Sequence, residues 1–482
     1  MQEKPGEGPA LSTEDLAYWS AELGRWAADY VATLRDRPVR AQTKPGEILE
    51  RLEAAPPEAG SAFETLFRDF QDIILPGITH WQHPRFFAYF AANSSPPSVL
   101  AEFLTSVLAA QCMLWQTSPA ATELEMRMMA WLRQMIGLPE DFRGVIQDSA
   151  SSATLAAILT ARERALDWKG NQQGLAGGPV CRIYTSVEAH SSIDKACWIA
   201  GIGQNNLVKV ESSGPRRGLD VVALEAAILA DRKAGLLPAG IVAVLGGTST
   251  GGCDDIAAIA GLAERYGLYL HVDAAWAGSA MICPEYRHLM AGAERADSFV
   301  FNPHKWLFTN FDCSAHFLRD PASLVRTLAI RPTYLETQGL DDIVNFSEWS
   351  IPLGRRFRAL KLWFVIRSYG VSGMQGLIRQ HIGWAQSLAE RLGQEPDFEI
   401  VTPPVLSLFS FRYRPKGAGD LDGLNARLLE QINNEGRIYL TQTSVQGQFV
   451  IRFQVGQTDT QAADVDLAYK VITETARNLC SA

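Results

Sequence analysis

The chain has 482 residues, of which 47% are hydrophobic and 20% charged, and its formal net charge at pH 7 is -9. A chain of this length is too long for one hydrophobic core and should divide into two or three domains. The composition is typical of a folded globular protein and not of a disordered one. The negative charge, without any basic cluster, argues against a nucleic-acid partner.

No apolar run approaches the roughly 20 residues that a membrane-spanning helix needs. The first residues, MQEKPGEGP, lack the apolar core of a signal peptide. The seven cysteines form no Cys-x-x-Cys pair, which argues against a zinc knuckle or a redox motif. Scattered free thiols fit a reducing compartment, so we expect a cytoplasmic protein without a membrane partner.

The N-terminal part predicts helices. Ser12 and the three residues after it are typical of a helix start, and residues 16–34 carry apolar side chains at helical spacing. An amphipathic helix this early has no core of its own to join, so we expect it to pack on a partner subunit. A second helical pattern runs over residues 63–74.

Residues 80–90 are aromatic and irregular, and they include His80 and His83. Two histidines at this spacing suggest a metal, but no carboxylate or cysteine accompanies them. We therefore interpret the stretch as an aromatic pocket wall and expect no metal site. Long helices are predicted over 97–113 and from Ser118, which would be an N-cap before Pro119.

From Val145 onward strands and helices alternate. Such repeats predict a mostly parallel sheet with helices on both faces, with ligands bound beyond the carboxyl ends of the strands. The expected strands begin at Val145 and cover 182–186, 207–211, 241–245, 268–273 and 298–301. Polar side chains follow these strands, and one pocket can collect them: Ser149, His190, Thr248, Asp273 and Lys305.

Lys305 is flanked by apolar residues, Phe299 to Phe301 before it and Trp306 to Phe308 after it. An ammonium group in such surroundings loses hydration, so its pKa falls and its amine can condense with an aldehyde to a Schiff base. The alternative is a lysine that extends its charged head into water.

The remaining polar residues fit one kind of ligand, a flat heteroaromatic aldehyde phosphate. Ser149, Ala150 and Ser151 open a helix and can seat the phosphate, or can simply cap the helix. Asp273 can keep a ring nitrogen protonated, or can cap a turn. His190 can stack on the ring, or can be an ordinary surface histidine.

Residues 351–370 and a stretch from about Gly373 predict two further helices. They lead to a smaller C-terminal α+β domain. Its expected strands are 399–401, 406–412, 438–442 and 449–455, and a helix over 464–478 closes the chain.

Two motifs identify a family resemblance. HVDAAWAGSA (271–280) and NPHKWLFTNFDCS (302–314) resemble the group II pyridoxal-phosphate-dependent decarboxylases. Residues 80–90, 118–125, 144–151 and 351–361 are similar to the aromatic-L-amino-acid decarboxylases in particular. The resemblance covers residues 15 to 370 and continues more weakly beyond.

The resemblance implies the α/β architecture of pyridoxal-phosphate enzymes of fold type I, with a mostly parallel seven-stranded sheet. It also implies a homodimer with shared active sites at the subunit interface and swapped N-terminal helices. We expect three parts: an N-terminal helical segment (1–90), a large cofactor-binding α/β domain (91–373) and the small C-terminal domain (374–482).

The resemblance also assigns roles. Lys305 would bind the cofactor, pyridoxal 5'-phosphate, and Asp273 would pair with its ring nitrogen. Tyr334, on an expected mobile loop, matches a tyrosine that protonates the substrate carbon after carbon dioxide leaves, whereas aldehyde-forming relatives carry phenylalanine there. The expected cofactor-binding residues are Ser149, Ala150, Ser151, His190, Thr248, Asp273, Ala275, Asn302, His304 and Lys305; Lys305, Tyr334 and His190 would be catalytic.

The expected substrate-binding residues are Trp81, Tyr89, Phe90, Gln111, Met113 and Gly354, some of them from the partner subunit. Gly354 leaves room that a serine would fill, which favours an indole. We therefore expect decarboxylation of aromatic L-amino acids to arylalkylamines and carbon dioxide.

Three alternatives stay open. Two remain within pyridoxal chemistry: an aromatic aldehyde synthase that couples decarboxylation to oxidative deamination, and a decarboxylase of another amino acid. The third is an inactive homologue that acts as a binding partner, which the intact Lys305, Asp273, His190 and Tyr334 disfavour.

Overall fold

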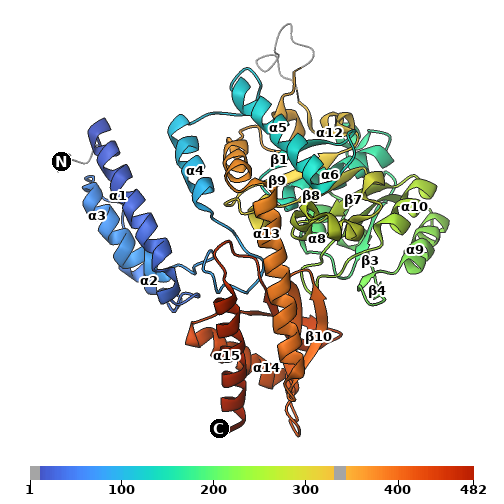
Figure 1. Ribbon diagram of the computed structural model, residues 1–482. Coiled ribbons are helices and arrows are strands. Elements are labelled where there is room, and N and C mark those ends of the chain that lie inside the picture. The colour runs from blue at the N-terminus through green and yellow to red at the C-terminus, as the bar shows by residue number, and fades with distance from the viewer. Residues whose placement is uncertain (1–10, 331–342, 482) are drawn as a thin grey trace.

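A seven-stranded sheet forms the centre of the computed structural model, which describes residues 11–330 and 343–481. Its strand order is β1-β9-β8-β7-β6-β2-β3 (Figure 1). All neighbours pair in parallel except those of β9, which is antiparallel to β1 and β8. The strands are β1 Arg143–Gln147, β2 Cys181–Ser186, β3 Leu207–Val210, β6 Leu237–Val244, β7 Tyr269–Asp273, β8 Ser298–Phe301 and β9 Ser314–Leu318.

Helices cover both faces of this sheet, as predicted. Neighbouring side chains of a strand point to opposite faces. Ile241 and Ala243 of β6 therefore belong to the core under α5, α9 and α10, while Val242 between them belongs to the core under α6 and α8. The helices are α5 Pro119–Ile136, α6 Ala150–Ala165, α8 Ser192–Ile199, α9 Val221–Lys233, α10 Ile256–Tyr266 and α12 Pro321–Leu328.

The N-terminal helices extend away from this body as an arm (Figure 1). Ser12 forms a capping box with Asp15 at the expected helix start, and helix α1 has no buried residue. Helix α4 ends at Leu108 and not near residue 113, because Ala109 adopts a left-handed conformation. The elements are α1 Thr13–Ala32, α2 Glu47–Arg51, α3 Phe63–Asp69, the single π-turn η2 Phe70–Ile74 and α4 Pro96–Leu108.

The C-terminal part is α+β, as predicted. Its sheet is antiparallel with the order β10-β11-β13-β12. Helix α14, Leu421–Glu435, was not predicted. In the central sheet, strand β9 was not predicted either. The remaining elements are β10 Phe398–Val405, β11 Leu408–Tyr413, β12 Thr441–Val445, β13 Gln448–Gln454 and α15 Ala462–Ser481.

Helix α13, Arg358–Gln394, joins the two parts and is broken at Gly370, whose φ of 64° and ψ of 165° are not helical. Two helices were predicted here from the sequence. The division into 1–90, 91–373 and 374–482 stays a prediction, and α13 crosses its last boundary. Within the described part of the chain, every helix is too short or too polar to cross a lipid bilayer.

The short elements connect this framework. They are η1 Leu34–Asp36, η3 Leu75–Gly77, α7 Gly170–Gln173, η4 Gln204–Asn206, β4 Ser212–Ser213, β5 Gly218–Leu219, η5 Ala277–Ile282, η6 Pro284–Met290, η7 Ala293–Arg295, α11 Pro303–Trp306 and η9 Phe346–Trp349.

Candidate active site

A cavity of about 260 Å³ lies at the carboxyl ends of the parallel strands. All ten residues that the sequence predicted around the cofactor line it: Ser149, Ala150, Ser151, His190, Thr248, Asp273, Ala275, Asn302, His304 and Lys305. Phe90, Ser192, Val244, Gly246, Gly247 and Trp276 complete the lining.

Lys305 reaches this cavity from α11, directly after β8. Its flanks, Phe299 to Phe301 and Trp306 to Phe308, are fully buried. The Asn93 amide donates to the Lys305 carbonyl oxygen at 2.6 Å and holds the turn. Burial lowers the pKa of Lys305, the Asp273 carboxylate opposes this effect, and the Arg452 charge adds to it. These surroundings favour an amine that can act as a nucleophile.

Asp273 ends β7 and is only 6% exposed. One of its carboxylate oxygens accepts the Ala275 N–H at 3.0 Å, so it does cap the following turn. The other oxygen has no hydrogen-bond partner among the described residues. A buried carboxylate with a free oxygen is costly unless a cation or donor reaches it, and a protonated ring nitrogen in the cavity is such a donor.

Two histidines on the cavity wall each have a defined tautomer. The Ser192 N–H donates to Nδ1 of His190 at 3.1 Å, and the Cys313 N–H donates to Nδ1 of His304 at 2.8 Å. In both neutral rings the proton is therefore on Nε2. Desolvation and the Lys305 charge lower the pKa of His190, and the same two causes lower that of His304 to about 3.

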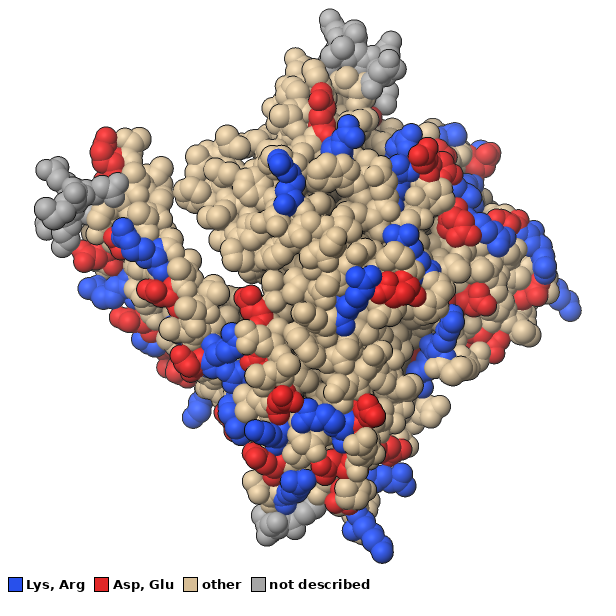
Figure 2. Space-filling model, viewed as in Figure 1, with Lys and Arg blue, Asp and Glu red and all other residues tan. Residues whose placement is uncertain are grey.

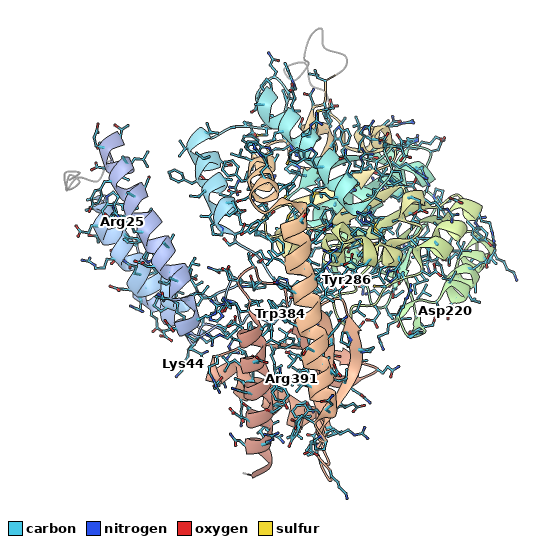
Figure 3. All side chains as sticks on the ribbon, in the orientation of Figure 1. Arg25, Lys44, Asp220, Tyr286, Trp384 and Arg391 are labelled. Carbon is cyan, nitrogen blue, oxygen red and sulfur yellow. The ribbon has the colours of Figure 1, made fainter. Side chains whose placement is uncertain are left out.

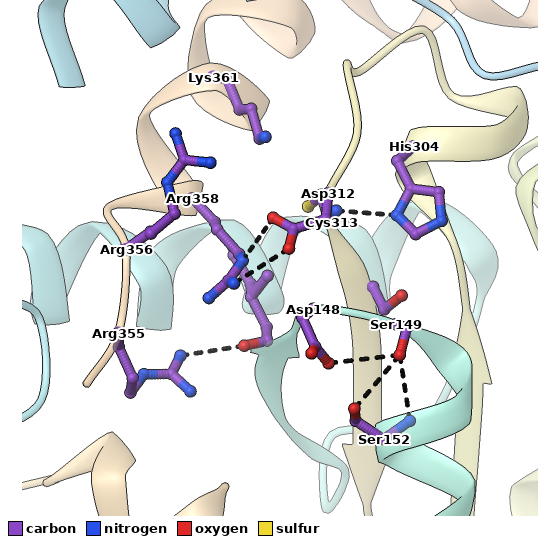
Figure 4. A network of polar contacts seen from close by, with 12 residues as sticks. Asp148, Ser149, Ser152, His304, Asp312, Cys313, Arg355, Arg356, Arg358 and Lys361 are labelled. Atoms are coloured by element: carbon purple, nitrogen blue, oxygen red, sulfur yellow. Dashed lines mark hydrogen bonds and ion pairs between the residues drawn. The ribbon is translucent and has the colours of Figure 1, made fainter. Parts of the chain in front are cut away.

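The part of the cavity lined by Ser149, Ala150 and Ser151 is suited to an anion. Ser149 is the N-cap of α6, and its hydroxyl accepts the Ser152 N–H at 3.2 Å (Figure 4). Ala150 and Ser151, the first residues of this 16-residue helix, line the cavity, and the N–H groups of a helix start attract negative charge. Gly246 has a φ of 80°, and a Cβ there would lie 2.6 Å from Ala277, so only glycine fits beside the cavity.

Sequence reasoning missed Arg452 of β13. Its guanidinium lies over the Phe90 ring at 5.3 Å, and Nζ of Lys305 lies over the same ring at 5.1 Å. Burial lowers the pKa of Arg452 to about 10, so it is charged at neutral pH. An arginine in the middle of the apolar run FVIRFQV was the available signal.

The predicted substrate residues do not share one cavity. Phe90 lines the cavity of Lys305, whereas the exposed Trp81 and Tyr89 stack on each other at 5.5 Å. Gln111 and Gly354 line a second cavity of about 360 Å³. Met113 lines neither cavity, and its carbonyl oxygen accepts the Ser347 N–H at 3.0 Å. Tyr334 lies outside the described residues.

The model of the pyridoxal-dependent decarboxylase conserved domain matches residues 45–414. The chain belongs to this family. Aromatic-L-amino-acid decarboxylase of Sus scrofa is 40% identical over 486 residues, which cover 98% of this chain and 98% of that protein. Phenylacetaldehyde synthase of Arabidopsis thaliana is 38% identical over 480 residues, or 97% of each chain.

The fold is shared with the crystal structure of Oryza sativa TDC with PLP and tryptamine. The TM-score is 0.94 at 34% identity, and the match covers 97% of this chain and 99% of that chain. The predicted family, fold class and cofactor are thereby confirmed, and the chain is a carboxy-lyase that uses pyridoxal 5'-phosphate. The amine, the buried carboxylate with a free oxygen and the helix start fit its aldehyde, ring nitrogen and phosphate.

Proposed function

We propose that this decarboxylase converts aromatic L-amino acids to arylalkylamines and carbon dioxide. The observation that carries the proposal is the convergence of Lys305 and the incompletely paired Asp273 carboxylate in one cavity, bordered by the aromatic rings of Phe90 and Trp276. Its relatives include an aromatic-L-amino-acid decarboxylase. An aromatic aldehyde synthase is the second candidate, because a phenylacetaldehyde synthase is also similar.

The residues of the cavity have distinct tasks in this proposal. When bound, pyridoxal 5'-phosphate supplies an aldehyde that condenses with amines and a ring that accepts the electrons left by carbon dioxide. Lys305 holds the aldehyde carbon, and Asp273 keeps the ring nitrogen protonated. His190 stacks on the ring and donates through Nε2, while Ser149 and the N–H groups after it bind the phosphate.

The other lining residues complete the binding site. In our proposal Asn302 and His304 lie beside Lys305, Thr248 beside the ring or the substrate carboxylate, Ala275 against the ring, and Ala150 and Ser151 at the phosphate. The Asn302 side-chain oxygen accepts the Ser314 hydroxyl at 2.6 Å, which leaves its N–H₂ group free to donate.

Tyr334 separates the two candidate functions. We propose that its hydroxyl donates a proton to the carbon from which carbon dioxide leaves. A protonated carbon yields the amine, whereas an unprotonated one is oxidised by dioxygen to hydrogen peroxide and an imine, which water hydrolyses to the aldehyde and ammonia. Tyr334→Phe should therefore divert product from amine to aldehyde and hydrogen peroxide. Unchanged amine formation would contradict this role.

The direct test of the function is a panel of tryptophan, 5-hydroxytryptophan, DOPA, tyrosine, phenylalanine, glutamate and ornithine. Carbon dioxide, amine and hydrogen peroxide are all measured for each amino acid. The proposal predicts equal amounts of carbon dioxide and amine from an aromatic member and no peroxide. Peroxide equal to carbon dioxide would show the aldehyde synthase, and turnover of only the non-aromatic members would refute aromatic specificity.

We also propose a homodimer with shared active sites. Helix α4 exposes six large apolar side chains, each 41% to 62% exposed: Val99, Leu100, Phe103, Leu104, Val107 and Leu108. An apolar patch of this kind marks an interface. The space-filling view shows a hollow between the N-terminal arm and the body, and the surface facing it carries few charges (Figure 2). A partner subunit can fill this hollow.

The two separate cavities support the same proposal. Gln111 and Gly354 were expected at the substrate, but none of the residues around them lines the cavity of Lys305. Gln111 and Gly354 can still lie at the substrate if these residues of one subunit complete the cavity of its partner.

Subunit mixing tests the shared site. Lys305→Ala and a pocket-blocking Gly354→Trp should each abolish activity. If the site is shared, a dimer of one Lys305→Ala and one Gly354→Trp subunit has one intact and one doubly altered site. About half of the dimers formed from equal amounts are of this mixed kind, so about a quarter of the wild-type activity should be recovered. No recovery, with mixed dimers verified by mass, would contradict the shared site.

The compartment is a further proposal. Six of the cysteines are buried free thiols: Cys112, Cys181, Cys197, Cys253, Cys283 and Cys313. Free thiols at these positions support a reducing compartment such as the cytoplasm.

A further inference from the structure

A third cavity, of about 430 Å³, lies beside helix α5 and the edge strand β1, on the upper part of the body in Figure 1. It shares no lining residue with the cavity of Lys305. Its lining consists of Glu123, Met126, Arg127, Met129, Ala130, Arg133, Phe142, Arg143, Gly144, Val344, Phe346 and Trp349. Neither the family chemistry nor the proposed function uses it.

Arg133 is the unusual member of this lining. Its side chain is on the last turn of α5 and is only 9% exposed. Its guanidinium has no hydrogen bond, ion pair or aromatic contact with any described residue. A guanidinium is charged at every relevant pH, and burying such a charge without a partner is unfavourable. The cavity therefore offers a cation that lacks its anion.

The other charged residues of the lining also favour an anion. Arg127 and Arg143 add two further cations, and Glu123 is the one acidic residue among the described residues that line the cavity. The Glu123 carboxylate accepts the Trp115 indole N–H at 3.1 Å, and no ion pair joins it to Arg133. The cavity favours an anion and disfavours an amine.

The walls are apolar and aromatic. Met126 and Met129 come from α5, Phe142 from the turn before β1, and Phe346 and Trp349 from η9. Phe346 and Trp349 meet edge to face, with centroids 5.8 Å apart. Methionine and aromatic side chains together suit a flat ring. The volume lies in the range of small-molecule sites, which are about 300–1,000 Å³.

We propose that this cavity binds a small aromatic carboxylate, with its carboxylate paired to Arg133 and its ring held between the methionine and aromatic walls. The Arg133 fork matches a carboxylate in two parallel hydrogen bonds. The site goes beyond the proposed function, because it neither needs the cofactor nor contacts the reacting groups.

The test uses 4-bromophenylacetate as the probe on the holoenzyme. Calorimetry measures its affinity for the wild type, for Arg133→Met and for the control Arg143→Met. Methionine replaces the unbranched arginine stem without its charge and has a similar helix propensity, so α5 is retained. Arg143 also lines the cavity, but its guanidinium is exposed and donates to the Glu140 carbonyl oxygen at 2.5 Å. A lost charge-assisted pair should weaken binding about tenfold or more in Arg133→Met, and under about threefold in Arg143→Met.

The location is checked in crystals, where the anomalous signal of bromine marks the probe. We expect a peak beside Arg133 in the wild type and none there in Arg133→Met. A peak only beside Lys305, equal affinity of the wild type and Arg133→Met, or equal affinity for inorganic phosphate would each overturn the proposal.

Discussion

The ion pair between Arg355 and Glu125 offers a quantitative test of how the core supports the predicted substrate residues. The side chains are 2% and 3% exposed, and Nη2 of Arg355 lies 2.5 Å from Oε1 of Glu125. The same carboxylate oxygen accepts the Ile146 N–H at 2.8 Å. The backbone N–H of Arg355 donates to the Gln111 side chain at 2.7 Å, so this pair anchors the wall formed by Gln111 and Gly354.

Glu125→Gln keeps the volume but removes the charge that neutralises Arg355. Breaking a buried pair leaves an uncompensated charge and costs about 3–5 kcal/mol. Because the glutamine oxygen can still accept the Ile146 N–H, we expect a loss near the lower limit, about 3 kcal/mol. The free energy of unfolding, measured by urea titration of the holoenzyme, gives the value.

The control is the ion pair of Arg391 with Asp466, which has nearly the same length, 2.6 Å, but is 35% and 58% exposed. Arg391 projects from the lower end of α13 (Figure 3). Solvent screens such a pair, so Asp466→Asn should cost less than about 1 kcal/mol. Equal losses in the two variants would refute the reasoning that burial, and not distance, sets the energy.

Three further predictions follow from the site and the core. Arg452→Met removes a buried cation near Lys305, so the pKa of Lys305 should rise and cofactor uptake by the apoenzyme should shift to higher pH; an unchanged profile would contradict this. A Cβ at Gly354 lies 3.4 Å from Gln111, so Gly354→Ser should fold and lower kcat/KM for tryptophan relative to tyrosine about tenfold. Burial lowers the pKa of His304 and of His316 to about 3, against about 6.5 in the unfolded chain. The contribution of the two neutral rings to the free energy of unfolding is therefore complete above about pH 6.5 and is lost as pH falls toward 3. A urea midpoint that does not fall between about pH 7 and about pH 5 would contradict this prediction.

The convergence of Lys305, Asp273 and His190 could be predicted because parallel strands place their carboxyl ends on one edge of a sheet. The strand pattern and the small residues after each strand were visible in the sequence. The same rule placed Ser149 at the N-terminus of α6, where the structure shows that it also caps the helix. The structure shows the helix cap, and the phosphate seat at Ser149 stays a prediction.

Strand β9 and the position of Arg452 beside Lys305 could not be predicted from the sequence. Ser314–Leu318 is a five-residue strand buried along its whole length, so it has no alternating pattern, and His316 interrupts its apolar run. Arg452 acts on Lys305 from a strand 147 positions later in the chain, and only the folded structure shows that contact. Gln111 and Gly354 were expected beside the substrate, but within one subunit they do not line the cavity of Lys305.

We propose above that the Lys305 amine holds the cofactor. Borohydride fixes the cofactor to the amine that carries it, and mass spectrometry of the digested holoenzyme then locates the label. We predict a single phosphopyridoxyl group, on Lys305, in a protein that absorbs at about 420 nm before reduction. A label on another lysine, or no label in an enzyme that releases carbon dioxide, would contradict the account.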